Sequence, residues 1–61
     1  MAQLTSKELS AIEDQLSLEQ LLVAKYKAYA QQSTDTQIKT KCEQIAAKHQ
    51  NHFDKLLQQL G

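Results

Sequence analysis

A single polar run divides this chain of 61 residues into two halves. The run, QQSTDT, covers residues 31–36. The sequence contains no Pro, and its one Gly is the last residue, so the strongest breakers of regular structure are missing from its interior. Gln, Leu, Lys, Ala and Glu dominate both halves, and all five are good helix formers. These features predict two long helices joined at the polar run.

The apolar residues of each half recur at steps of three and four. Such spacing places them on one face of a helix rather than on alternate sides of a strand. Three polar residues occupy positions in this pattern, namely Glu19, His49 and His52. We predict that the stripes form the core of the hairpin and of its dimer through Leu9, Ile12, Leu16, Val23, Tyr26, Ile38, Cys42, Ile45, Phe53, Leu56 and Leu60.

Both predicted helices begin with capping signals. Thr5 followed by Glu8 fits a capping box, in which the Thr side chain and the Glu side chain each accept a backbone N–H. Thr34 followed by Gln37 fits a second box, with Asp35 near the positive end of the helix dipole. We therefore predict Thr5 and Thr34 as the N-caps.

The capping signals and the stripes together set the expected boundaries. They predict helices over about residues 6–31 and 35–59, with a turn at 32–35, in one domain that covers residues 1–61. Helices of this length joined by so short a link must pack antiparallel. The predicted fold is thus all-α, a two-helix hairpin.

A hairpin of this size is expected to need a partner. A chain of about 60 residues buries only about 60% of the surface that it exposes on unfolding, and a single Cys, Cys42, cannot close an internal disulfide. We expect Cys42 to be a buried structural thiol. The stripes are also wider than the seam between two helices. We predict a homodimer in which two hairpins form a ferritin-like four-helix bundle.

Charge and hydropathy exclude several classes of partner. Seven Lys balance seven acidic residues, which gives a net charge of zero without a basic cluster, so neither nucleic acid nor a membrane surface is an expected partner. No stretch reaches the 18 apolar residues of a membrane span. A soluble, intracellular protein is expected.

The three polar residues in the stripes are candidate metal ligands. If the turn centres between residues 33 and 34, Glu19 faces residue 48, which brings His49 within reach and leaves His52 one layer further from the turn. Carboxylate and imidazole groups that project inward from facing helices suit iron, manganese or zinc. One arrangement is a single zinc held by two Glu19 and two His49 across the dimer axis. The alternative is a hydrogen-bonded Glu19–His49 pair, and His52 could also chelate an ion together with His49.

The residue pattern resembles a known family. Glu19 and Tyr26, seven residues apart, and a His midway along the second helix are similar to half of a ferritin-like di-iron bundle. The whole chain resembles the small ferritin-like hairpins of the spore coat F type from spore-forming bacteria. The residues that carry this resemblance are Leu18, Glu19 and Tyr26, the turn at 33–35, Ile38 and Ile45, and the segment HQNHF at 49–53.

One position departs from the di-iron pattern. The Glu-x-x-His motif that ends at His49 requires Glu at position 46, where this chain has Ala46. In ferritin-like di-iron proteins that Glu bridges the two metals, so we expect no di-iron oxidase activity, no catalytic residue and no resident cofactor beyond a possible single transition metal.

The resemblance implies a non-enzymatic structural or interaction protein that acts in the spore or its coat, with itself and other coat proteins as partners. Two alternatives stay open. One is a metal-binding protein with a degenerate ferritin-like site at Glu19 and His49, and the other is a generic helical adaptor.

Overall fold

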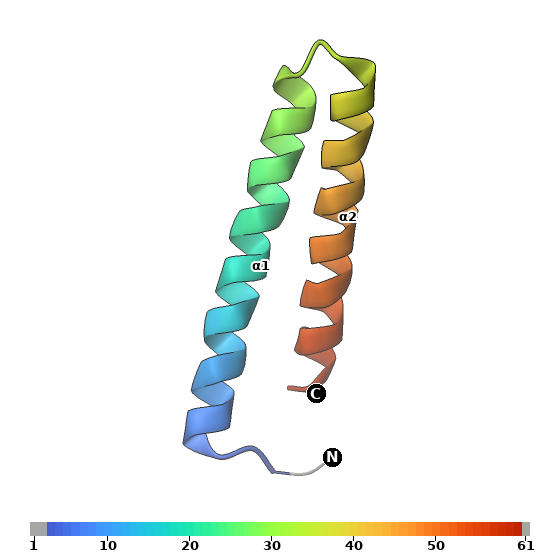
Figure 1. Cartoon of the computed structure of the whole chain (residues 1–61). Helices are drawn as coiled ribbons and strands as arrows, with labels where there is room; N and C mark the ends of the chain where they lie inside the picture. The colour runs from blue at the N-terminus through green and yellow to red at the C-terminus, as the bar shows by residue number, and fades with distance from the viewer. Residues whose placement is uncertain (1–2, 61) are drawn as a thin grey trace.

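Two antiparallel helices make up the regular structure of residues 3–60, which are the residues that the computed structural model describes. Helix α1 spans Ser6–Gln32 and helix α2 spans Thr36–Gln58. They lie side by side along an elongated molecule of 47 × 16 × 11 Å, with the turn at one end (Figure 1). The predicted all-α hairpin is confirmed, with helix ends within one residue of the expected ones.

The start of α1 agrees with the sequence prediction. The Thr5 hydroxyl accepts the backbone N–H of Glu8 at 3.1 Å, and the Glu8 carboxylate accepts the backbone N–H of Thr5 at 3.0 Å. These two bonds satisfy donors that have no partner inside the helix. The hydrogen bond from the Thr5 backbone is the main reason that the pKa of the Glu8 carboxyl lies below its ordinary value. The Thr5 side chain lowers this pKa further.

The start of α2 differs from the prediction, because Asp35 and not Thr34 is the N-cap. One carboxylate oxygen of Asp35 accepts the N–H of Gln37 at 2.8 Å and that of Ile38 at 3.1 Å. The Ser33 hydroxyl also accepts the N–H of Asp35 at 3.2 Å, which steadies the cap. A carboxylate satisfies two donors at once and carries a charge that the helix dipole favours, so it displaces the weaker hydroxyl cap.

The seam between the helices is built from small side chains and one carboxylate. Val23, Ala30, Cys42 and Ala46 are buried, and Glu19 is the buried polar residue among those described. Of the predicted core, Val23 and Cys42 are therefore buried, and Cys42 is a free thiol. Six other members are half-buried: Ile12, Leu16, Tyr26, Ile45, Phe53 and Leu56.

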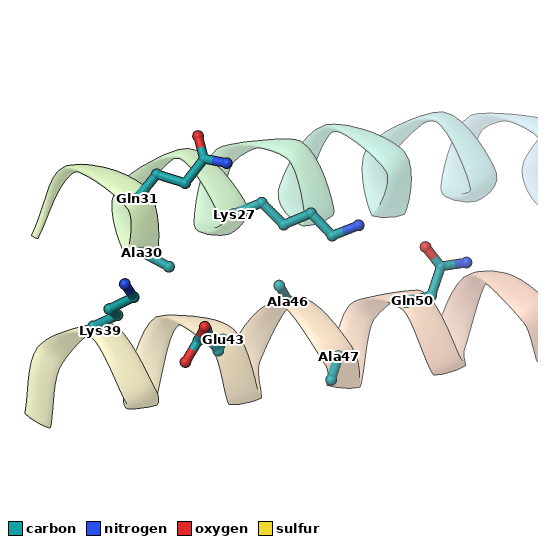
Figure 2. A pocket seen from close by; sticks show the side chains of 8 residues that line it. All are labelled: Lys27, Ala30, Gln31, Lys39, Glu43, Ala46, Ala47 and Gln50. Carbon is teal, nitrogen blue, oxygen red and sulfur yellow. The ribbon is translucent and has the colours of Figure 1, made fainter. Parts of the chain in front are cut away.

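Three predicted core residues are exposed in the single hairpin, namely Leu9, Ile38 and Leu60. Two helices can cover only one stripe of each other, so large side chains on the flanks of the stripes keep contact with solvent. The prediction also missed Ala30 and Ala46 as core members. Their short side chains let the helix backbones approach, and Figure 2 shows both directed into the space between the helices.

The two long sides of the hairpin differ in chemistry. A shallow groove on one side is lined by Lys27, Ala30, Gln31, Lys39, Glu43, Ala46, Ala47 and Gln50 (Figure 2). At about 100° per residue, the opposite flanks of both helices carry apolar residues, and Lys25 borders them with its Nζ 5.8 Å from the centre of the Tyr29 ring. We call this opposite side the apolar face and define it by Leu18, Leu22, Tyr29, Ile38 and Ile45.

Neither helix in the described part of the chain has the length and apolar character that crossing a membrane requires.

Candidate metal centre

Glu19 lies at the centre of the polar cluster. It is the middle residue of the 27 in α1, it sits in the stripe that faces α2, and it is 4% exposed. A buried carboxylate is costly unless other groups hydrogen-bond to it. Three side chains approach its carboxylate. Gln15 lies one turn earlier in α1, and His49 and His52 belong to α2.

His49 makes the shortest of these contacts. Its Nδ1 lies 2.6 Å from one carboxylate oxygen of Glu19, a distance at which a protonated nitrogen donates a strong hydrogen bond. The Tyr26 ring stacks on the imidazole, with ring centroids 6.3 Å apart and planes 17° apart. The predicted Glu19–His49 pair is therefore present, and Tyr26 fixes the orientation of the imidazole ring.

His52 approaches the same carboxylate. Its Nδ1 lies 3.2 Å from the second oxygen of Glu19, and its ring packs edge-on against that of His49 at 5.6 Å. Counting residues from the turn predicts that His52 lies one layer away from Glu19, and this prediction is wrong. Helical side chains lean toward the N-terminus of their own helix. In an antiparallel pair Glu19 leans away from the turn and His52 leans toward it, so the two meet.

The same leaning explains the position of Tyr26. Counting residues from the turn places Tyr26 opposite residue 41, near Cys42. The Tyr26 ring instead points toward the open end of the hairpin, where it meets the His49 ring, which leans toward the turn. Tyr26 also packs edge-on against Tyr29 at 5.8 Å, which links the cluster to the apolar face.

The environment of Glu19 favours its ionised form. Burial pushes the pKa of its carboxyl upward, but the hydrogen bonds from His49 and Gln15 and the charges of His49 and His52 together hold the pKa below its ordinary value. The amide nitrogen of Gln15 contributes at 3.5 Å, the upper limit for such a bond. The site therefore presents a carboxylate, not a carboxylic acid, at neutral pH.

Carboxylate and imidazole are both ligands for divalent transition metals. Glu19, His49 and His52 each offer one ligand atom, and these three atoms all lie within 4.8 Å of one another. Two imidazoles and one carboxylate form the ligand set of several catalytic zinc sites and of mononuclear iron sites. The alternative is that the carboxylate only accepts a hydrogen bond from His49 and pairs with the nearby His52 ring.

Ala46 occupies the position at which the di-iron pattern requires a bridging Glu. It is 3% exposed, and Figure 2 shows its side chain directed toward α1. A methyl group there closes the seam and offers no ligand, so one hairpin contributes one carboxylate to the centre.

Comparison of the chain with protein-family models, with curated proteins and with solved structures finds no match. The geometry of the cluster and the surface chemistry of the hairpin therefore carry the functional argument.

Proposed function

We propose that this chain is a non-enzymatic structural protein that works as a homodimer. Two hairpins associate through their apolar faces and form a four-helix bundle. The resemblance to the spore coat F type supports a place for this bundle in the spore coat, where it would pack with copies of itself and with other coat proteins.

The observation that carries the proposal is the amount of apolar surface left uncovered. The seam buries four apolar residues, none larger than Val23. Several large apolar residues are at least 37% exposed, namely Leu9, Leu18, Leu21, Tyr29, Ile38, Leu57 and Leu60. Three of them, Leu18, Tyr29 and Ile38, belong to the apolar face, and exposed apolar side chains gathered on one face mark sites of protein association.

A second copy of the chain is the partner that the dimensions favour. The broad side of the hairpin extends over 47 × 16 Å, so a second hairpin of the same dimensions can lie along its whole length. The net charge of zero creates no repulsion between identical chains. Most soluble oligomers are symmetric dimers, in which one self-complementary face serves both chains.

Sedimentation equilibrium at micromolar concentration tests the proposal. We expect a dimer for the unaltered chain, with a melting temperature that rises with protein concentration because only the folded chain associates. Ile38→Lys, which places a charge in the apolar face, should shift the chain toward monomer. Ala47→Lys is the matched control on the same helix, since Ala47 is exposed and lines the groove on the opposite side of the hairpin.

A chain that stays monomeric and cooperatively folded at micromolar concentration would contradict the homodimer and favour the adaptor alternative, in which the apolar face binds another protein. The location is tested separately. Antibody detection in coat extracts and in core extracts of spores should place the protein in the coat fraction, and its recovery from the core alone would contradict that part of the proposal.

A further inference from the structure

We propose that Glu19, His49 and His52 form a mononuclear site for a divalent transition metal, with zinc as the best fit, and that the site is complete within one chain. This differs from the zinc site across a dimer axis considered above, because His52 takes the place of the ligands from a second chain. The inference does not depend on dimerisation.

The ligand spacing suits a tetrahedral ion. Bonds of 2.0–2.1 Å to nitrogen and oxygen place tetrahedral ligand atoms about 3.3 Å apart. Nδ1 of His52 already lies 3.2 Å from a Glu19 oxygen, and Nδ1 of His49 lies 2.6 Å from the other. All three ligand atoms lie within 4.8 Å of one another, so rotations of the Glu19 carboxylate and of the two imidazole rings would bring each pair to the spacing that the ion requires.

The helices fix the positions of all three ligands. His49 and His52 are three residues apart on α2 and therefore lie on one face, while Glu19 projects from the facing stripe of α1. Ligands held by regular helices are placed more accurately than ligands held by loops. The site is thus largely preformed.

Neighbouring side chains support the ligands. Tyr26 stacks on His49, and Gln15 donates toward Glu19. Outer contacts of this kind orient metal ligands and strengthen binding. The exposure of the ligand side chains rises from Glu19 through His49 to His52, at 6%, 23% and 42%. The buried carboxylate can anchor an ion while the His52 edge leaves a coordination position open to water.

Zinc titration of tag-free protein by calorimetry tests the site. We expect one ion per chain. His52→Asn should weaken binding by more than about tenfold, because loss of an outer-shell contact alone commonly costs 10–100-fold. Glu19→Gln should have at least as large an effect. Circular dichroism establishes whether each variant is folded, and His52→Asn is the safest variant because His52 is the most exposed ligand.

Two control variants remove other potential ligands. Glu13→Gln changes an exposed carboxylate on α1 and should leave zinc affinity unchanged. Cys42→Ser removes the thiol, which is a strong zinc ligand in its own right, and should also leave the affinity unchanged. If the Cys42 variant loses binding while the His52 variant retains it, the proposed ligand set is wrong.

The stoichiometry separates this inference from the dimer proposal. Half an ion per chain, lost in the Ile38→Lys monomer, would overturn the inference in favour of a site across the dimer axis. One ion per chain in that monomer would support it even if the dimer proposal fails. Absence of zinc binding to the folded, unaltered chain would overturn the inference and would mean that Glu19 serves only as a hydrogen-bond acceptor.

Discussion

Two different kinds of side chain fill the seam between the helices along the length of the hairpin. From the turn to the middle of α2, Ala30, Cys42 and Ala46 fill the seam with small groups that need no partner. At the middle of α1, Glu19 fills it with a carboxylate that His49 and His52 must satisfy. The helices lie farther apart at the open end than at the turn (Figure 1), and the half-buried stripe residues toward that end, Leu16, Phe53 and Leu56, are larger. Close approach requires small residues, whereas a polar layer requires space and long side chains.

The small-residue layer and the polar layer also contribute differently to the fold. The small-residue layer gains dispersion contacts and loses little side-chain entropy on folding. The polar layer offsets a desolvation cost with hydrogen bonds, so its net contribution is smaller, but only one register of the helices brings Glu19 to both histidines. We infer that the first layer stabilises the hairpin and the second aligns it.

The largest effect is expected from overpacking the small-residue layer. Ala46→Leu would insert a bulky group where the residue is 3% exposed, and we expect a loss of about 1–3 kcal/mol in the free energy of unfolding. Urea unfolding at a fixed protein concentration measures the loss. Ala47→Leu is the matched control, because Ala47 is exposed and points away from α1 (Figure 2).

The control should change the free energy of unfolding by less than about 0.5 kcal/mol. Equal losses in the free energy of unfolding for Ala46→Leu and Ala47→Leu would contradict the difference between the two layers. They would show that close approach at the small-residue layer does not hold the helices together.

A smaller loss in the free energy of unfolding is expected from a change at the turn, where the N-cap of α2 lies. Asp35→Ala removes the acceptor for the N–H groups of Gln37 and Ile38 and should cost about 1 kcal/mol in thermal or urea unfolding. Thr34→Ala is the control, and its effect should be much smaller because Thr34 is not the cap. A larger loss for the Thr34 variant would restore the capping box that the sequence analysis predicted.

The smallest effect at neutral pH is expected from Glu19→Gln, which keeps the shape of the side chain and leaves groups that can hydrogen-bond to both histidines. Because the pKa of the Glu19 carboxyl is lowered on folding, its ionised form stabilises the fold above its unfolded pKa of about 4.3. That contribution is lost as the pH falls through the lower, folded pKa.

Melting temperatures from pH 7 to pH 2 test this expectation. The unaltered chain should lose stability at the acid end, and the Glu19 variant should lose less. Glu13→Gln, which changes an exposed carboxylate on the same helix, should follow the unaltered chain. Matching acid profiles for the Glu19 variant and the unaltered chain would show that the polar layer does not couple pH to folding.

Much of the fold and part of the polar cluster follow from the sequence. The Thr5 capping box and the steps of three and four identified both helices, and the turn position brought His49 to Glu19. The prediction of Thr34 as the cap is wrong because the Thr34–Gln37 spacing fits a capping box, whereas the stronger acceptor, Asp35, decides the cap. His52 was misplaced because counting residues locates Cα atoms and ignores the direction in which side chains lean.

The sequence by itself determined an all-α hairpin, because residues without internal Gly or Pro, in two apolar stripes joined by a short polar run, have no other compact arrangement. Only the tertiary structure decided which residues meet across the seam. It buried Ala30 and Ala46 instead of the larger stripe residues, and it brought His52 to Glu19. The physical reason is that periodicity fixes the face of a helix, whereas contact across the seam depends on helix separation and side-chain direction.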